Sequence, residues 1–182
     1  MSDDRSSALS LVTAPASEPL TLAQAKTFLR IENTADDEPI TRALTAARVA
    51  AEQYLRVALL PQTWDFSVAN PASCEIHLPF GPAQSITSVT LTTEAGAVAT
   101  LNTANYRLSV SGYSVLFDPP VSIEKLTIRY VAGIAATVGD VPLPIVQGML
   151  HHIVVMMENR DGTAPLPMQS VRCYQPYRRI VL

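Results

Sequence analysis

The sequence predicts an α+β protein, a small helical bundle interrupted by an antiparallel β insertion and followed by an extended C-terminal arm. Apolar side chains recur at helical spacing before residue 60 and after residue 141. Between these stretches, short runs rich in Val, Ile and Thr are separated by Pro, Gly and Asn. With 182 residues, 48% of them hydrophobic, the chain is long enough for a core of its own.

The N-terminal part divides into a loose arm and a first helix. Residues 1–18 are rich in Ser, Ala and Asp without a sustained period, which predicts a flexible arm. After Pro19, Thr21 and Gln24 have the spacing of a capping box. We therefore expect a helix from about residue 21 to 31.

A second helix is expected from about residue 37 to 57. Acidic side chains at 36–38 suit the start of this helix, where the helix dipole favours negative charge. The alternative, that they form a catalytic acid–base pair, is less favoured. At 100° per residue its apolar side chains share one arc. They are Ile40, Ala43, Leu44, Ala47, Ala51, Tyr54 and Leu55.

The β insertion spans residues 61–140 and predicts a small antiparallel sheet or sandwich. Strands are expected near 62–69, 74–78, 85–92, 105–110, 113–117 and 124–131. A ligand-binding module, for carbohydrate or another ligand, would use Trp64, Tyr106 or Tyr113 from these strands. Strand aromatics more often pack in a core, which is the favoured interpretation here.

A last helix begins at Pro142 or Pro144, which suit a first turn, and runs to about Asn159. Apolar residues cover more than half of its circumference, which is typical of a helix that is central in its domain or shared with a neighbouring subunit. We predict that its second apolar stripe forms a lateral subunit interface. The stripe consists of Val146, Leu150, Val154 and Met157.

Residues 161–182 are punctuated by proline and predict an extended docking arm. Tyrosine and arginine anchor protein interfaces and also contact nucleic acid, so protein docking, nucleic-acid binding and a frayed tail all stay open, with docking favoured. The predicted docking residues are Arg172, Tyr174, Tyr177, Arg178 and Arg179.

Charge and cysteine usage exclude several classes of protein. The formal net charge of −3 argues against a protein that grips phosphate backbones. The charge is uneven, because residues 163–182 contain three arginines and no acid, which leaves −6 for residues 1–162. The 16% of charged residues is below the roughly 25% of typical domains, which suggests that partners cover part of the surface. Two distant cysteines favour a reduced, cytoplasmic origin, and we expect no signal peptide and no membrane span.

The sequence contains few candidate residues for catalysis or metal binding. His151 and His152 are adjacent on a predicted helix and point about 100° apart, which does not suit one ion. Cys74 and His77 have a ligand-like spacing but lack a second pair, so ordinary strand residues are the favoured interpretation. We find no phosphate-binding loop or nucleophile elbow, and therefore expect no enzyme and no cofactor. A hydrolase that uses His151 or Asp37 is the remaining catalytic alternative.

The order of elements resembles the phage head-tail connector (adaptor) proteins, in particular the branch with a β-rich insertion found in prophages and gene transfer agents. The matching stretches span residues 19–160 in order. They are LTLAQAK at 20–26, LRI at 29–31, DD at 36–37 before Ile40, AAR at 46–48 before Glu52, LLPQTW at 59–64, LPFGP at 78–82 before Ile86 and Val89, YVAG at 130–133, VP at 141–142 and ENR at 158–160. The ending YRR at 177–179 also resembles the family, whereas QSVRC at 169–173 is less apolar than the family's usual lead-in.

The resemblance implies a structural subunit of a ring, commonly of twelve copies, in a virion or phage-like particle assembled in the bacterial cytoplasm. Such a ring lies between the portal protein and a stopper or tail-side connector, and double-stranded DNA passes through it without specific binding. A ring needs two different side surfaces, and the apolar last helix offers surplus surface for one of them. Negative subunits also ease DNA passage, so an acidic lumen is a hypothesis. The expected divisions are 1–18, 19–60 with 141–160, 61–140 and 161–182.

Overall fold

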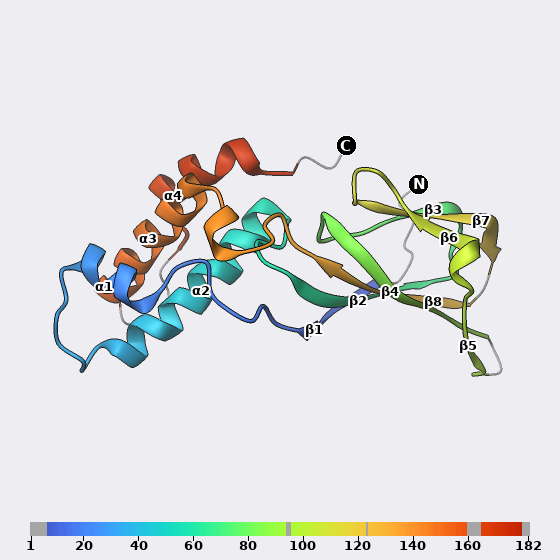
Figure 1. Ribbon diagram of the computed structural model, residues 1–182, viewed down its shortest axis with the longest axis horizontal. Coiled ribbons are helices and arrows are strands. Elements are labelled where there is room, and N and C mark those ends of the chain that lie inside the picture. The colour runs from blue at the N-terminus through green and yellow to red at the C-terminus, as the bar shows by residue number, and fades with distance from the viewer. Residues whose placement is uncertain (1–6, 94–95, 123, 160–164, 180–182) are drawn as a thin grey trace. The chain divides into compact units, whose positions relative to one another are not determined.

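The computed structural model describes residues 7–93, 96–122, 124–159 and 165–179 (Figure 1). The chain divides into two compact units. The β unit comprises Met1–Pro15 and Pro61–Ile134, and the helical unit comprises Ala16–Leu60 and Ala135–Leu182. The predicted α+β class is confirmed, with residues 135–140 in the helical unit rather than in the insertion.

Among the described residues, the helical unit contains the three predicted helices and a fourth. They are α1 (Leu22–Leu29), α2 (Asp37–Leu55), α3 (Leu143–Glu158) and α4 (Met168–Tyr174), with short 3-10 turns η2 (Val138–Asp140) and η3 (Gln175–Tyr177). The capping box at the start of α1 is present, because Thr21 Oγ1 accepts the N–H of Gln24 while Gln24 Oε1 accepts the N–H of Thr21. The predicted arc of α2 faces the interior.

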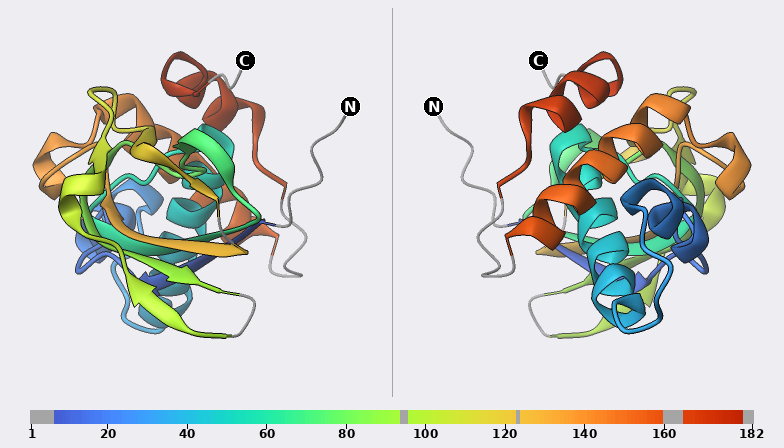
Figure 2. Two further views of the ribbon diagram at one scale, coloured as in Figure 1. Left: turned by 90° about the vertical axis from the view of Figure 1, so that its right-hand side faces the viewer. Right: turned by 90° about the vertical axis from the view of Figure 1, so that its left-hand side faces the viewer.

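The core of the helical unit lies mainly between α2 and α3, with α1 and α4 packed beside them (Figure 2). Both helices contribute aliphatic side chains with almost no exposed surface, and this burial stabilises the unit. In these helices the largest are Ile40, Leu55, Ile145, Met149 and Ile153, and Leu20 and Leu59 add to them from segments next to α1 and α2.

A buried ion network inside the helical unit ties α2 to the segments before and after it. The guanidinium of Arg48 donates to Glu18 and to Glu52, both at 2.8 Å. Glu52 also accepts the N–H of Leu59 at 2.9 Å, and the carbonyl of Leu59 accepts the N–H of Ala135 at 3.1 Å. Charges this deeply buried are tolerated because each has paired partners. The network therefore fixes where the chain leaves α2 and where it returns to the helical unit.

The described part of the β unit forms two antiparallel sheets. The five-stranded sheet has the order β1 (Ser7–Thr13), β2 (Gln62–Ala69), β8 (Lys125–Ala132), β4 (Ala83–Thr92) and β5 (Val98–Thr100). The three-stranded sheet has the order β3 (Ala72–His77), β7 (Ser114–Ser122) and β6 (Tyr106–Leu108), and the 3-10 turn η1 (Thr103–Asn105) precedes β6. The side chains of Phe66, Val89, Val115, Phe117, Leu126, Ile128 and Tyr130 are buried in this unit.

Two predictions about the ends of the chain are wrong for the described residues. Ser7–Thr13 is not a loose arm, because it forms strand β1 and pairs antiparallel with β2. The segment after residue 164 is not an extended arm, because Met168–Tyr174 forms helix α4, which packs on α3. Residues 1–6, 161–164 and 180–182 of the two predicted arms lie outside the described residues, as does residue 160 at the end of the predicted helical core. Strand β5 was also not predicted.

Candidate interaction surfaces

Helix α4 is held on α3 by a close approach at Gly148. The hydroxyl of Ser170 donates to the carbonyl of Gly148 at 2.6 Å. The ring of Tyr174 occupies the space where a β-carbon at residue 148 would lie. Glycine is therefore required at this position for α4 to pack as it does.

Tyr174 is a core residue, which corrects its prediction as a docking residue. Its side chain has no exposed surface, and its ring lies 6.0 Å from the ring of Tyr54 on α2. Burial raises the pKa of the Tyr174 hydroxyl far above its usual value, and the nearby Cys173 thiol adds to the shift. The hydroxyl is buried without a hydrogen-bond partner among the described residues. Tyr174 therefore holds the C-terminal segment in place rather than contacting a partner.

The structure brings two of the predicted arginines to the C-terminal end of α2. The guanidinium of Arg178 lies over the ring of Tyr54, 5.1 Å from its centroid, and the backbone N–H of Arg179 donates to the carbonyl of Leu55 at 3.0 Å. Arg56 caps the same helix end. Three arginines therefore lie at this end of α2, Arg56 as the cap and Arg178 and Arg179 in the segment that contacts it.

The remaining two predicted docking residues are accessible. Arg172 is exposed on α4, and Tyr177 in η3 has 38% of its surface exposed. Both lie in the C-terminal segment that contributes Arg178 and Arg179. Four of the five predicted docking residues are thus at least partly exposed, although Arg179 less than the others.

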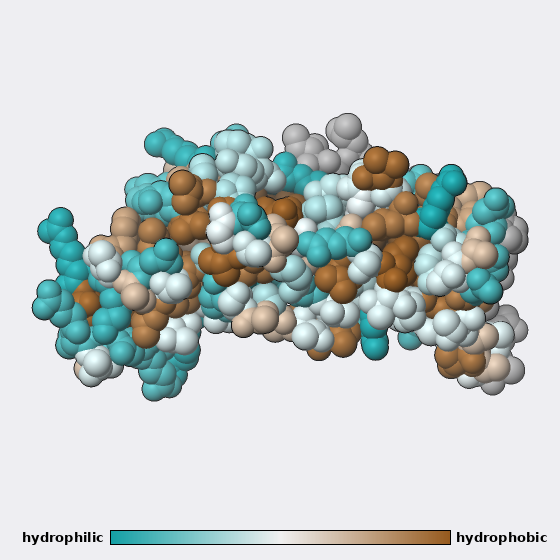
Figure 3. Space-filling model, in the orientation of Figure 1, coloured by the Kyte–Doolittle hydropathy of each residue, from teal (hydrophilic) through white to brown (hydrophobic). Residues whose placement is uncertain are grey.

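The predicted lateral stripe of α3 lies next to the buried face of the helix, outside the set of its buried residues. Val146, Leu150, Val154 and Met157 are partly exposed, and Leu143 in the first turn is 80% exposed. We call these five residues the α3 outer face. Figure 3 shows hydrophobic patches over the region where α3 and α4 lie. The helical unit therefore leaves an apolar face of α3 partly in contact with water.

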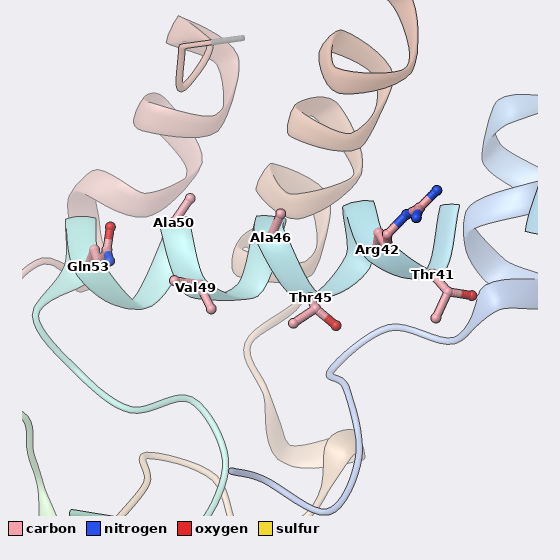
Figure 4. A pocket seen from close by; sticks show the side chains of 7 residues that line it. All are labelled: Thr41, Arg42, Thr45, Ala46, Val49, Ala50 and Gln53. Carbon is pink, nitrogen blue, oxygen red and sulfur yellow. The ribbon is translucent and has the colours of Figure 1, made fainter. Parts of the chain in front are cut away.

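A shallow groove runs along the side of α2 that points away from its buried residues. Successive turns of α2 contribute short side chains to it, with Arg42 near one end and Gln53 at the other (Figure 4). Val49 in this groove is 39% exposed. We call the lining residues the α2 groove, and they are Thr41, Arg42, Thr45, Ala46, Val49, Ala50 and Gln53.

The aromatic residues of the β unit pack against one another. The ring of Trp64 stacks on Phe80 with centroids 5.0 Å apart, and its indole nitrogen is buried. Tyr106 packs against Phe117 at 6.4 Å. The ring of Tyr113 fills the space beside Gly81. These contacts favour core packing over a ligand-binding surface.

The candidate catalytic and metal-binding residues are not brought together. The carboxylate of Asp37 pairs with the ammonium of Lys26, whereas the ring of His151 packs edge-on against Phe28. Within the described ranges, no group of three or more His, Cys, Asp or Glu side chains could hold a metal ion. Every helix in the described part of the chain is too short or too polar to cross a membrane.

Sequence reasoning missed Tyr54 and Arg56 as parts of the C-terminal surface, and it missed the α2 groove. Tyr54 falls in the apolar arc of α2, which indicates burial but not the cation above its ring. The groove could have been predicted from the short side chains on the polar side of α2, at Thr45, Ala46 and Ala50.

Comparison with known proteins gives one family and a set of similar structures. The head completion protein family matches residues 18–150. One similar structure is a chain in the neck of an empty gene transfer agent (GTA) particle computed with C6 symmetry. It is 20% identical to this chain and superposes with a TM-score of 0.81, and the match covers 96% of this chain and 97% of that one. A chain in the virion of a native gene transfer agent (GTA) particle is 22% identical with a TM-score of 0.77, over 96% of both chains. A chain in the neck of a native GTA particle computed with C12 symmetry is 22% identical with a TM-score of 0.76, over 96% of this chain and 97% of that one. No curated protein matches.

Proposed function

The chain belongs to the head completion protein family, and from this premise we propose that it is a structural head-tail adaptor subunit of a tailed phage or gene transfer agent. In this role it forms a closed ring, expected to be dodecameric, between the portal and the stopper or tail-side connector. The family match over residues 18–150 is the observation that carries the proposal.

The similar structures support this location. They are chains of a gene transfer agent neck and virion, and the neck reconstructions have C6 and C12 symmetry. Their similarity extends over both units of this chain, so the proposal does not depend on one shared motif. The role is one of assembly and requires no catalysis or cofactor.

We assign portal docking to the accessible part of the C-terminal segment. Arg172, Tyr177, Arg178 and Arg179 offer guanidinium donors and one amphipathic ring, which are frequent anchors at protein interfaces. Guanidinium groups pair best with carboxylates, so the portal surface should present acidic side chains. Tyr174 contributes indirectly, because it holds α4 on α3.

We assign the lateral contact within the ring to the α3 outer face. A ring subunit needs two different side surfaces, and an apolar helix face left partly exposed in the single chain suits one of them. DNA passes through the ring without specific binding, in keeping with a subunit net charge of −3.

Two variants test the docking assignment in particles. Deleting residues 163–182 should give DNA-filled or leaking heads without tails. This deletion also removes α4, so the second variant keeps the fold and reverses three charges, Arg172→Glu, Arg178→Glu and Arg179→Glu. Electron microscopy should show tailless heads for both variants. Normal tailed particles from the charge-reversed variant would refute the docking role.

A further inference from the structure

The α2 groove and the α3 outer face are two separate surfaces of the helical unit. On α2 the residues that pack inward include Ile40, Leu44 and Ala47, and the groove lies on the other side of the helix. On α3, Ile145 and Met149 pack inward, and the outer face lies next to them. Because α2 and α3 pack on each other through their buried residues, the groove and the outer face are two different exposed surfaces of the unit.

We infer that the α3 outer face of one copy docks in the α2 groove of the next copy, which makes the two surfaces the complementary halves of one repeated contact. The inference rests on the proposed ring. A contact between two unlike surfaces of a subunit propagates around a ring, whereas a contact between like surfaces closes after two copies.

The shapes of the two surfaces are complementary. The α3 outer face carries branched or long aliphatic side chains such as Leu150, Val154 and Met157. The lining of the α2 groove includes Ala46 and Ala50, whose short side chains allow another helix to approach closely. Large side chains over small ones give the dense packing that a stable interface needs.

The charges give the contact a direction. α3 contains no Lys, Arg or Asp, and its single acidic residue, Glu158, is exposed at its C-terminal end. Arg42 near the N-terminal end of α2 belongs to the groove, and its side chain is 71% exposed. An antiparallel pair of helices brings Glu158 of one copy to Arg42 of the next.

The same antiparallel direction already exists within the chain. Within the helical unit, α2 and α3 pack on each other and run in opposite directions (Figure 1). In a ring of about twelve copies, neighbours differ by a rotation of about 30°, which largely preserves helix direction. An α3 that meets the next α2 is therefore also nearly antiparallel to it.

This alignment fixes a register that can be tested. Both helices rise by about 1.5 Å per residue. Placing Glu158 opposite Arg42 puts Val154 opposite Ala46 and Leu150 opposite Ala50. Gln53, in the same groove, then lies about 10 Å along the helix from the position that faces Val154.

Disulfide trapping in purified particles tests the contact. The background variant carries Cys74→Ser and Cys173→Ser, so that only introduced cysteines react. The test variant adds Ala46→Cys and Val154→Cys, and mild oxidation should convert most of the chain into a ladder of linked copies on a non-reducing gel. Either cysteine alone should leave the chain as a single copy, because the contact joins unlike surfaces. The pair Gln53→Cys and Val154→Cys is the control for register and should not form a ladder.

The outcomes separate the inference from the proposed function. If the chain is present in the particles but the test pair forms no ladder, or the Gln53 pair forms one instead, the inferred contact is overturned while the adaptor role stands. A single cysteine that links two copies would also overturn it. If normal tailed particles lack the chain, the proposed function fails and the inference fails with it.

Discussion

The ring of Tyr174 lies directly against Gly148, in the space that a side chain at residue 148 would occupy. This contact, together with the hydrogen bond from Ser170 to Gly148, positions the C-terminal segment on α3. The arginines proposed to meet the portal are therefore placed by a glycine in the middle of a helix, at a position where alanine would normally be preferred.

Gly148→Ala should destabilise the free subunit. At an unobstructed helical site this change stabilises by about 1 kcal/mol, but here the new β-carbon overlaps a buried ring, and overpacking typically costs about 1–3 kcal/mol. Because the new β-carbon would lie well inside contact distance of the Tyr174 ring, we expect a cost in the upper part of this range and a net loss of about 1–2 kcal/mol in urea unfolding. Gly139→Ala is the control, because its β-carbon would meet only Thr137 Oγ1, at 3.8 Å. Equal stability of Gly148→Ala and the wild type would contradict the packing described.

Tyr174→Phe should change the stability of the subunit at alkaline pH. Burial raises the pKa of Tyr174 in the folded state, so its stabilising contribution is present below the unfolded pKa near 10 and is lost as the pH rises above it. The variant should be as stable as the wild type at pH 8, or up to about 1 kcal/mol more stable because an unpartnered hydroxyl is removed. At pH 11 its advantage should grow. An unchanged difference between the two pH values would count against burial of the hydroxyl, and Tyr177→Phe is the control.

Arg48→Met should be strongly destabilising. It removes the cation that pairs with Glu18 and Glu52 and leaves the almost fully buried Glu52 carboxylate without it, a change that typically costs about 3–5 kcal/mol. Arg42→Met, on the same helix, is the control. It breaks only an exposed pair with Glu38 and should cost less than about 0.5 kcal/mol. Chemical unfolding of dilute subunit measures both, and similar losses for the two variants would show that the network carries little stability.

Asp65→Asn should reduce the acid sensitivity of the β unit. The hydrogen bond from Arg129 is the main reason that the pKa of Asp65 is lowered in the folded state. A lowered pKa contributes stability that is present above the unfolded pKa near 4 and is lost as the pH falls through the folded value. The wild type should therefore lose more stability than the variant between about pH 5 and pH 2. If thermal unfolding shows that the wild type and the variant lose the same stability between these pH values, a stabilising role for the Asp65–Arg129 pair is refuted.

Local signals predicted most of the helical unit and most of the strands. The capping box at Thr21 marked the start of α1, and the apolar arc of α2 faces the core as expected. Strand β1 was missed because Leu11 and Val12 are exposed and the strand exists through pairing with β2, more than fifty residues away. Helix α4 was missed because a seven-residue helix is marginal in isolation and forms here through contact with α3.

The candidate surfaces were predicted only in part, because local patterns identify surplus apolar surface but not contacts between distant segments. The α3 stripe could be recognised because periodicity showed more apolar surface than one core needs. Tyr174 could not be assigned to the core, since an aromatic residue beside arginines in a proline-rich tail has the composition of an interface anchor. Its burial, its contact with Tyr54 and the glycine opposite it on α3 reveal its role only in the folded structure.

The most direct test of the adaptor role is a cryo-electron microscopy reconstruction of the neck in particles assembled with this chain. We predict density for the two-unit fold in a closed ring, with copies related by rotation about the DNA channel, on the tail side of the portal and with the C-terminal segment against it. Particles in which the portal contacts the tail-side connector directly, with this chain absent or located elsewhere, would contradict the account.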